Sequence, residues 1–514
     1  MSDNSPIHPR VRVRFAPSPT GPLHLGGVRT ALYNYLFAKK HGGDFLLRIE
    51  DTDQTRYVAG AEQYILDSLK WAGMSWAEGP DIGGSNAPYR QSERKHLYKQ
   101  YADQLIANEF AYYAFDTTED LEDMRNKAEA GGATNWKYDY ITRDYMKNSL
   151  TLSEDEVNER LQNEEAYVIR LKTPRNEEIK LHDIIRGYVS VQSKEIDDKV
   201  LYKSDGMPTY HLANVVDDHL MEISHVIRGD EWLPSAPLHV LLYRYLGWED
   251  TMPEFAHLPL ILKPDGNGKL SKRDGDRLGF PVFALDWIDP TSGEKSSGYR
   301  ENGYLPEAFI NIIALLGWHP ADNKELLSME ELVELFSLER VSKAGAKFDP
   351  EKAKWFNQQY LHHLPDADII SMLNVQVKEA GIQASNEYIS QVAMLTRDKA
   401  HFTQDMLGNS RYFFDTPTNY DQNILAKRYN EAAIAFCKVL ADVWSKKPFE
   451  SAEEAKATFE KTATDRDEKP GNYMQLLRVL ITGEAGGPDL WHILYLMGTK
   501  TCVDRIQIAL KVLG

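Results

Sequence analysis

The sequence predicts an α/β protein with a doubly wound domain that is interrupted by an insertion and followed by an all-helical region. Residues 11–15 alternate apolar and charged side chains, as a half-buried strand does, and an apolar stripe with helical spacing runs from Val28 to Leu36. Strand and helix signals resume at 210–262, after a segment richer in charge and tyrosine. Beyond residue 304 almost every apolar pattern has the period of a helix.

Changes of composition divide the chain into six predicted segments. The polar start is expected to be loose, the insertion begins where charge rises, and the helical region follows a glycine-rich loop and one further helix. The segments are an extension (1–10), the first half of the α/β domain (11–107), the insertion (108–209), the second half (210–262), the loop with its following helix (263–340) and the helical region (341–514).

Local signals place individual elements within these segments. Pro306 opens a predicted helix that Gly317 closes, and residues 151–156 carry the pattern of a helix start. Alternating or apolar runs predict strands at 11–15, 45–49, 167–172, 188–191 and 223–227. Other predicted features are a helix at 91–110, a break between helices at 483–488, and a helical stripe formed by Val503, Ile506, Leu510 and Leu513.

Length and composition limit the class of protein. With 514 residues and 42% hydrophobic residues, the chain is long enough for several cores. It has no apolar run of about 18 residues and no signal-peptide pattern, so we expect neither a membrane span nor export. Cys437 and Cys502 are the only cysteines, which excludes a disulfide framework and a cysteine-built zinc site. We therefore expect a cytoplasmic protein without zinc.

The turn after the first strand carries His24, Gly26 and Gly27. Glycine lets the backbone approach a ligand closely, and the N-terminus of a helix offers unpaired N–H groups, so this turn favours a phosphate. His24 can donate a hydrogen bond to a phosphate oxygen on which charge develops. Taken alone, such a pattern is more often only a turn before a helix.

A second motif follows in the glycine-rich loop 264–276, which contains Lys269, Ser271, Lys272 and Arg273. A mobile loop of this kind can fold over a polyphosphate and neutralise the leaving group. Taken alone, it is more often a solvated hairpin. The two motifs together, in this order, predict a two-part ATP site.

Charged residues end three of the predicted strands. Arg14, Glu50 and Arg228 stand at or just beyond the carboxyl ends, where open α/β sheets bind ligands. Two guanidiniums and one carboxylate complement the two carboxylates and the ammonium of glutamate, whereas glutamine does not need the second cation. The alternative is that both arginines pair within the scaffold and that Glu50 and its acidic neighbours cap the next helix.

The segments His24–Gly27 and Lys269–Arg273 resemble the HIGH and KMSKS signatures of class I aminoacyl-tRNA synthetases. From residue 11 onward the chain is most similar to bacterial-type glutamyl-tRNA synthetases. Gly27 takes the place of the second histidine of the first signature, so His24 is the only imidazole there. The resemblance implies a Rossmann-type catalytic domain, an inserted α+β acceptor-binding domain, a stem-contact domain with the KMSKS-like loop, and an all-α anticodon-binding region.

The resemblance also implies the reaction and the residues that perform it. The reaction is ATP-dependent attachment of L-glutamate to tRNA(Glu) through glutamyl-adenylate, with Mg²⁺ arriving with ATP, transfer to the 2′ hydroxyl, activation that requires bound tRNA, and a monomeric enzyme. The implied catalytic residues are His24, Lys269 and Lys272. The implied glutamate site is Arg14, Ser18, Glu50, Tyr210, Asn214 and Arg228, and the implied ATP site is His24, Gly26, Gly27, Trp232, Leu262, Lys269, Ser271, Lys272 and Arg273.

The formal net charge of −18 opposes RNA binding in general. A local exception is the segment 340–360, in which basic residues alternate with aromatic ones that can stack on unpaired bases. An amphipathic helix with a solvated lysine face is the other interpretation. The resemblance places the start of the anticodon-binding region here, and the predicted tRNA contacts are Lys343, Lys347, Lys352, Lys354 and Trp355.

Three other functions compete with this interpretation. Glutaminyl-tRNA synthetase is opposed by the paired arginines and by the helical carboxyl-terminal region. A tRNA-independent adenylyltransferase does not need that region, and a non-catalytic RNA-binding relative does not need His24 and the loop lysines. The cluster Asp217, Asp218, His219, Glu222, His225 and Asp230 is interpreted as capping and sheet-edge groups rather than as a metal site. Whether tRNA(Gln) is also charged stays open.

Overall fold

The computed structural model describes residues 10–132 and 135–514, which form two compact units. The first unit takes in the residues before Asn302 together with Phe309–Pro350, and the second takes in Asn302–Ala308 with Glu351–Gly514. The chain passes from one unit to the other three times: after Glu301, within helix α9 (Pro306–Ala314) and after Pro350.

A parallel sheet forms the centre of the first unit. Strand β1 (Arg12–Phe15) pairs in parallel with β2 (Asp44–Leu47), and β8 (His225–Gly229) pairs in parallel with β9 (Glu254–Leu258). The two pairs meet where the Ser224 N–H donates to the Arg12 carbonyl at 2.9 Å. The strand order therefore reverses between β1 and β8, which opens a crevice beyond their carboxyl ends. The predicted doubly wound sheet is confirmed.

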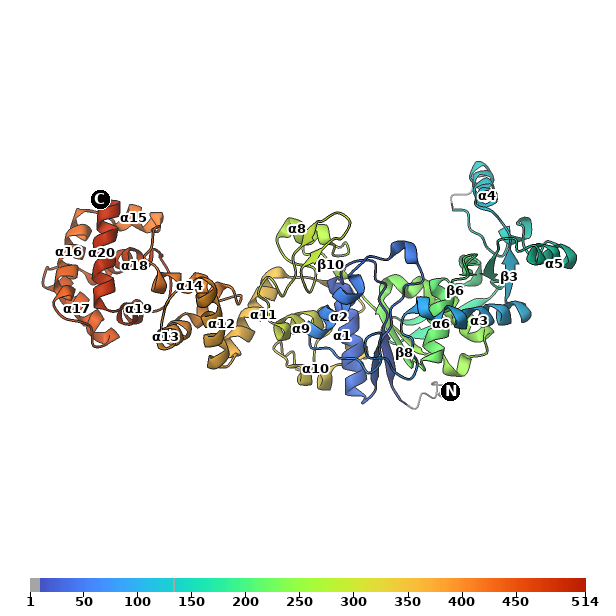
Figure 1. Ribbon diagram of the computed structural model, residues 1–514, viewed down its shortest axis with the longest axis horizontal. Helices are drawn as coiled ribbons and strands as arrows, with labels where there is room; N and C mark the ends of the chain where they lie inside the picture. The colour runs from blue at the N-terminus through green and yellow to red at the C-terminus, as the bar shows by residue number, and fades with distance from the viewer. Residues whose placement is uncertain (1–9, 133–134) are drawn as a thin grey trace. The chain divides into compact units, whose positions relative to one another are not determined.

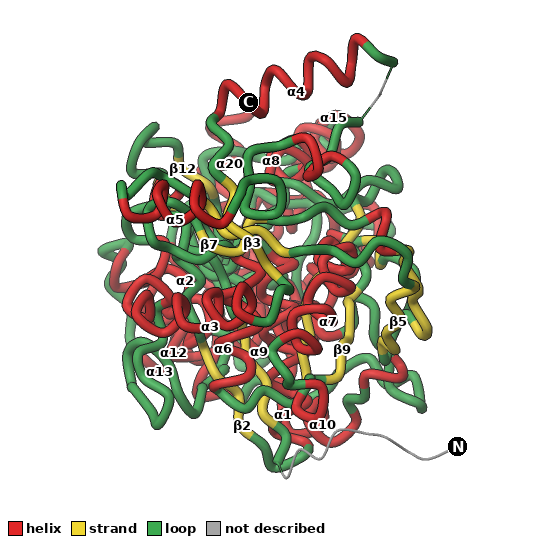
Figure 2. The backbone as a smooth tube through the Cα atoms, turned by 90° about the vertical axis from the view of Figure 1, so that its right-hand side faces the viewer, coloured by secondary structure: helices red, strands yellow, loops and turns green. Residues whose placement is uncertain are grey.

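Helices cover both faces of this sheet. Phe15 faces α1 (Leu25–Lys40): the Phe15 ring lies 3.8 Å from the position that a Cβ atom at Gly27 would occupy. Arg14 faces the opposite side of the sheet, where it pairs with Asp218 of α6 (Tyr210–Leu220). The predicted stripe from Val28 to Leu36 is buried along α1. Helix α7 (Ala236–Tyr245), labelled in Figure 2, packs against β5 (Glu178–Asp183), a strand that belongs to the same sheet as β8 and β9. Further helices of this part are α2 (Ala61–Trp71), α3 (Lys95–Ala107) and α10 (Met329–Leu335).

The segment between the two halves contributes to two sheets. An antiparallel sheet of β3 (Ala111–Ala114), β4 (Val168–Leu171) and β7 (Val200–Tyr202) is accompanied by α4 (Thr118–Ala130) and α5 (Glu154–Gln162) (Figure 1). The hairpin of β5 (Glu178–Asp183) and β6 (Gly187–Gln192) instead joins β9 and widens the central sheet. Alternate residues of β5 are buried, so this strand needs a neighbouring layer to cover them. The predicted limits at 108 and 209 stay predictions.

Short elements follow the central sheet in the first unit. Strand β10 (Ile261–Leu262) pairs in parallel with β13 (Ala346–Lys347), and β11 (Trp287–Ile288) pairs antiparallel with β12 (Lys295–Ser296). Helix α8 (Lys272–Leu278) lies between β10 and β11 in the sequence. It begins with a capping box at Ser271 and is followed by Gly279, whose φ is +75°.

The second unit is helical throughout its described residues, as predicted. The break at 483–488 separates two helices, and Gly483 ends the first of them with a φ of +81°. Cys437 and Cys502 are buried in the core, and burial raises the pKa of each thiol to about 12. The helices are α11 (Pro350–His363), α12 (Asp366–Glu379), α13 (Asn386–Thr396), α14 (Asp405–Phe414), α15 (Gln422–Arg428), α16 (Glu431–Ser445), α17 (Ala452–Thr464), α18 (Met474–Thr482), α19 (Leu490–Met497) and α20 (Thr499–Leu513).

None of the helices formed by the described residues is long and apolar enough to cross a membrane.

A buried ion pair ties α3 to α6 in the first unit. Asp217 accepts hydrogen bonds from Arg94 at 2.7 Å, Gln91 at 2.9 Å and Tyr98 at 2.9 Å, and its side chain is fully buried. Breaking a buried pair costs more than breaking an exposed one, because the charge that remains has neither water nor a partner.

We therefore expect Asp217→Ala to lower the free energy of unfolding by about 3–5 kcal/mol. The matched variant is Asp144→Ala, which breaks the exposed Arg175–Asp144 pair (2.7 Å) and costs about 0–1 kcal/mol. Urea unfolding followed by tryptophan fluorescence measures both. Equal losses would contradict the role given to the buried pair.

Candidate active site

Two adjoining cavities lie beyond the carboxyl ends of β1, β2 and β8. The larger measures about 800 Å³ and the smaller about 370 Å³. Residues that line both are Ser18, Thr20, Arg56 and Trp232. The crevice predicted from the strand order thus holds two cavities that share lining residues. Most of the predicted site residues line one or both of them, whereas Arg14, Asn214, Arg228, Leu262 and Arg273 line neither.

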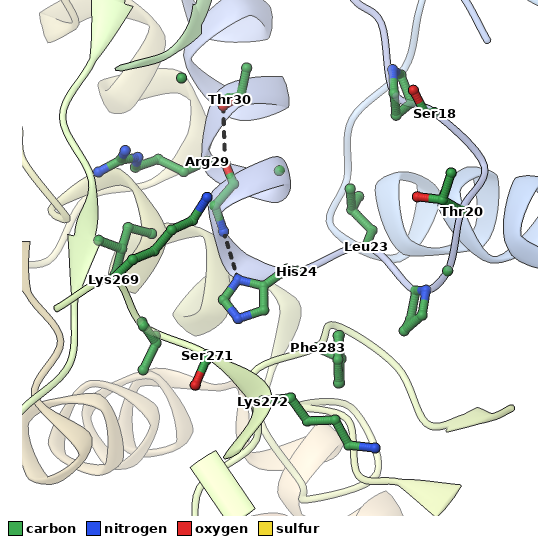
Figure 3. Close-up of a pocket in the computed structure, with 18 of the residues that line it drawn as sticks. Ser18, Thr20, Leu23, His24, Arg29, Thr30, Lys269, Ser271, Lys272 and Phe283 are labelled. Carbon is green, nitrogen blue, oxygen red and sulfur yellow. Dashed lines mark hydrogen bonds between the residues drawn. The ribbon is translucent and has the colours of Figure 1, made fainter. Parts of the chain in front are cut away.

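His24 lines the larger cavity at the start of α1. Its Nδ1 accepts a hydrogen bond from the Gly26 N–H at 3.4 Å, so the ring proton resides on Nε2. This Nε2 is buried and has no hydrogen-bond partner among the described residues. Burial, together with the charge of Lys269, lowers the pKa of His24 to about 4. A neutral imidazole therefore offers one unused N–H to the cavity (Figure 3).

The two glycines beside His24 serve different purposes. A side chain at Gly26 would meet no atom within 4 Å, so this position leaves the cavity surface open at the helix N-terminus. A Cβ atom at Gly27 would lie 2.5 Å from Cδ1 of Leu23, so a larger residue there would require the Leu23 side chain to shift. The glycines predicted for ligand approach thus divide into one open position and one that packs closely against Leu23.

The glycine-rich loop supplies two lysines to the same cavity. Lys269 pairs with Glu231 at 3.3 Å, and Lys272, at the start of α8, pairs with Glu294 at 2.8 Å. Both lysines, both glutamates and Ser271 line the cavity, and Figure 3 shows Lys269, Ser271 and Lys272 around His24. The predicted Arg273 does not line it.

Of the two residues predicted near the adenosine, one lines the larger cavity. Trp232 does so and packs on Tyr210 with ring centroids 4.3 Å apart. Leu262 does not line it, and its carbonyl accepts from the Phe348 N–H at 3.1 Å within the β10–β13 pair. The neighbouring Leu260 and Ile261 line the cavity instead.

The smaller cavity is lined by Ser18, Glu50 and Tyr210 among the predicted glutamate residues. Behind Glu50 lies a buried network. Asn214 donates to Glu50 at 2.9 Å, and Arg48 donates to Glu50 at 3.0 Å. The carboxylate thus keeps a fixed place at the cavity wall instead of capping a helix.

The two arginines predicted for glutamate have different surroundings. Arg14 forms a two-point pair with Asp218, at 2.9 and 3.1 Å, as the scaffold alternative proposed. Arg228 is 5% exposed and donates to the Tyr210 hydroxyl at 3.0 Å and to His257 Nε2 at 3.0 Å. Among the described residues no carboxylate forms an ion pair with Arg228. Neither Arg228 nor Asn214 lines either cavity; both lie behind residues that line the smaller one, Arg228 behind Tyr210 and Asn214 behind Glu50.

The network also contains residues that the sequence analysis missed or misinterpreted. Arg48 is fully buried and donates to Asp218 at 2.8 Å as well as to Glu50. A charged residue inside the apolar run 45–49 was the available signal, since a buried guanidinium must have an acidic partner. Asp218, interpreted as a capping group, is that partner.

Two other members of that acidic and histidine cluster, Asp230 and His219, also have partners within the protein. Asp230 pairs with Arg186 at 3.0 Å, and His219 stacks on Trp248 with centroids 3.8 Å apart. Within residues 10–132 and 135–514 no group of histidine, cysteine and carboxylate side chains has the arrangement of a metal site.

The residues predicted to contact tRNA belong to both units. Lys343 and Lys347 lie in the first unit, Lys347 on β13. Lys352, Lys354 and Trp355 lie on α11 in the second unit. Trp355 is 39% exposed, and Lys354 forms an exposed pair with Glu351 at 2.7 Å.

Comparison with known proteins covers nearly the whole chain. A family model described as tRNA synthetases class I (E and Q), catalytic domain, matches residues 10–355, and an anticodon binding domain model matches residues 358–510. A glutamate–tRNA ligase of Cytophaga hutchinsonii is 52% identical over 515 residues, which span 100% of this chain and 99% of that protein.

Two further relatives are equally extensive. A glutamate–tRNA ligase of Phocaeicola vulgatus is 53% identical over 505 residues, 98% of this chain and 99% of that protein. The crystal structure of a glutamate tRNA ligase from Elizabethkingia meningosepticum, in complex with its amino acid, has a TM-score of 0.94 at 49% identity. It covers 98% of this chain and 100% of that chain.

The surroundings of His24 lead to a prediction about its titration. We expect His24 to titrate near pH 4, because burial disfavours the charged imidazolium, and to stay neutral from pH 6 to 8. Lys269→Ala removes the nearby positive charge that also lowers the pKa of His24, so we expect that pKa to rise. The matched variant Lys272→Ala leaves the pKa of His24 unchanged. NMR titration of ¹⁵N-histidine-labelled protein measures this. A wild-type value near 6.5 would contradict the assigned environment.

Proposed function

We propose that this chain, which belongs to the class I tRNA synthetases of the glutamate and glutamine group, attaches L-glutamate to tRNA(Glu) at the expense of ATP. The observation that carries the choice of glutamate is Arg228, a buried guanidinium beside Tyr210 with no carboxylate partner among the described residues. A side-chain carboxylate supplies the missing counter-charge. The neutral amide of glutamine leaves Arg228 buried without one, which is costly.

In the first step the α-carboxylate of glutamate attacks the α-phosphorus of ATP. The bond from this phosphorus to the bridging oxygen breaks in line, glutamyl-adenylate forms, and pyrophosphate leaves. His24 donates its Nε2–H to a phosphate oxygen. As the loop closes over the nucleotide, Lys269 leaves Glu231 and Lys272 leaves Glu294, and both lysines pair with phosphate oxygens instead. Mg²⁺ enters with ATP as part of the substrate.

In the second step the 2′ hydroxyl of the terminal tRNA adenosine attacks the activated carbonyl, and AMP leaves. This step needs no covalent enzyme intermediate. Both cysteines are buried with raised pKa values, so neither thiol is a nucleophile at neutral pH. Catalysis therefore rests on positioning and on stabilising charge as it develops on the phosphates.

The amino acid occupies the smaller cavity and ATP the larger one. Ser18 and Trp232 line both, so they stand where the α-carboxylate meets the α-phosphate. Glu50, fixed by Asn214 and Arg48, faces the substrate ammonium. Arg14 acts through Asp218 and Arg48 on the position of Glu50.

The tRNA contacts the insertion with its acceptor end and the second unit with its anticodon. Lys343, Lys347, Lys352 and Lys354 neutralise backbone phosphates locally, although the whole chain carries −18. Trp355 offers an exposed ring for stacking. The enzyme acts as a monomer in the cytoplasm, where its substrates tRNA and ATP are found.

Charging assays test the function directly. We expect radiolabelled glutamate to be transferred to total bacterial tRNA only when ATP is present, and glutamine not to be transferred, because only glutamate has a side-chain carboxylate for Arg228. Separate assays with purified tRNA(Glu) and tRNA(Gln) then define the tRNA specificity. Charging by glutamine would refute the assignment of Arg228, and no charging with either would favour an adenylyltransferase or a non-catalytic protein.

Two substitutions separate the roles of the cavities. Lys272→Ala lowers the rate of activation roughly a hundredfold, since it removes a contact to the phosphates. Arg228→Ala instead raises KM for glutamate, since it removes a buried charge pair worth about 2–5 kcal/mol. Lys295→Ala, which breaks an exposed pair with Asp286 (2.8 Å) outside both cavity linings, is the control and keeps wild-type kinetics. Unchanged kinetics in the folded Lys272→Ala and Arg228→Ala variants would refute the roles proposed for Lys272 in activation and for Arg228 in glutamate binding.

A further inference from the structure

A chain of buried polar side chains lies behind Arg228. Arg228 Nε donates to His257 Nε2 at 3.0 Å, and His257 Nδ1 lies 2.6 Å from Asp183 Oδ2. The side chains of Asp183 and His257 are both fully buried. Asp183 stands at the end of β5, His257 on β9 and Arg228 on β8, so three neighbouring strands of the sheet supply one residue each.

The hydrogen bonds fix the tautomer of His257. A guanidinium can only donate, so His257 Nε2 must accept from Arg228 and carries no proton. The ring proton is therefore on Nδ1, where it is donated to Asp183. Burial lowers the pKa of His257 despite the hydrogen bond to Asp183, so the ring is neutral at pH 7. The Asp183 carboxylate is held in turn by the backbone N–H groups of Ile185 at 3.0 Å and Arg186 at 2.7 Å.

A second neutral ring meets Arg228 from α7. His239 Nδ1 lies 3.3 Å from Arg228 Nη1, and His239 Nε2 lies 3.2 Å from His211 Nδ1. Here too the nitrogen that faces Arg228 must accept. Burial and the charge of Arg228 lower the pKa of His239 well below its ordinary value, so this ring is neutral as well. Arg228 is thus oriented by groups that do not cancel its charge.

We propose that Asp183 and His257 are positioning residues that set the selectivity for a carboxylate, by holding Arg228 in place through a neutral imidazole of fixed tautomer. This inference rests on the proposed role of Arg228 in binding the side-chain carboxylate of glutamate. A carboxylate in direct contact, as Asp218 is with Arg14, would compete with the substrate. The imidazole moves the negative charge of Asp183 one residue away and leaves the guanidinium unpaired.

The isosteric change Asp183→Asn tests the tautomer. The oxygen of the introduced amide can keep the bonds to the backbone N–H groups of Ile185 and Arg186, and the NH₂ group of that amide then faces His257 Nδ1. The backbone N–H of His257, which lies 3.1 Å from one oxygen of Asp183 and 3.3 Å from the other, then donates to the oxygen that remains. The histidine then accepts at Nδ1 and carries its proton on Nε2, which faces the N–H of Arg228. We expect KM for glutamate to rise roughly 10–100-fold, by analogy with the loss of residues that orient metal ligands. KM for ATP stays within about twofold, since no ATP contact is changed.

A rescue variant, His257→Gln, distinguishes positioning from a purely structural role. The amide oxygen of the introduced side chain can accept from Arg228, and an amide has no tautomers that depend on Asp183. We therefore expect His257→Gln to keep KM for glutamate near the wild-type value. Adding Asp183→Asn to His257→Gln should change KM for glutamate little. Asp198→Asn is the matched control. It neutralises another buried carboxylate, which accepts from Arg143 at 3.1 Å and Tyr112 at 2.8 Å, and it leaves KM for glutamate unchanged. ¹⁵N NMR assigns the proton of His257 to Nδ1 in the wild type and to Nε2 in Asp183→Asn.

The outcomes are separable from those for the proposed function. If Arg228→Ala raises KM for glutamate but folded Asp183→Asn does not, the positioning role is refuted and the function stands. An equal effect of Asp183→Asn with and without His257→Gln also refutes it. If Arg228→Ala leaves KM unchanged, the role of Arg228 and the positioning role fall together. If Asp183→Asn does not fold, His257→Leu takes its place, because leucine cannot accept a hydrogen bond from Arg228. The inference then requires KM for glutamate to be well above the value for His257→Gln. Equal KM values for the two variants would overturn the inference.

Discussion

The carboxylate of Asp218, shared by Arg14 and Arg48, is the interaction on which the site depends. Arg14 comes from β1, Arg48 follows β2, and Asp218 belongs to α6, so one anion joins two strand ends to the helix that covers them. All three side chains are almost fully buried. Taking such charges out of water costs several kcal/mol per ion, and only mutual pairing offsets that cost. The same Arg48 holds Glu50, so the position of the cavity wall follows from this pairing.

The first unit thus uses two kinds of buried arginine. Arg14 and Arg48 are neutralised by fixed carboxylates and serve to define the geometry. Arg228 is surrounded by a hydroxyl and two neutral imidazoles, and none of the described carboxylates forms an ion pair with it. The larger cavity has a comparable division, because the imidazole of His24 is fixed at the helix start while the lysines of the loop are exposed enough to change partners.

Much of this could be predicted from the sequence where local pattern decides structure. The first strand, the stripe of α1, the helix start at 151–156 and the family implied by the resemblance were all confirmed. The addition of β5 and β6 to the central sheet could not be predicted, because pairing between strands distant in the sequence leaves no periodic signal. Likewise, nothing near Glu294 identifies it as the partner of Lys272, since an exposed glutamate in a hairpin is ordinary.

The pairs Lys269–Glu231 and Lys272–Glu294 also bear on which anions the loop can hold in a cell. A singly charged ion such as chloride or acetate would have to replace a carboxylate of equal charge that is already tethered to the protein. Such an exchange gives no additional electrostatic attraction to the lysine, and the bound ion loses translational entropy. A triphosphate brings several negative charges on one molecule, so it can displace both glutamates at once. The two ion pairs thus disfavour small monovalent anions at the loop lysines, relative to a polyanion, without any steric gate.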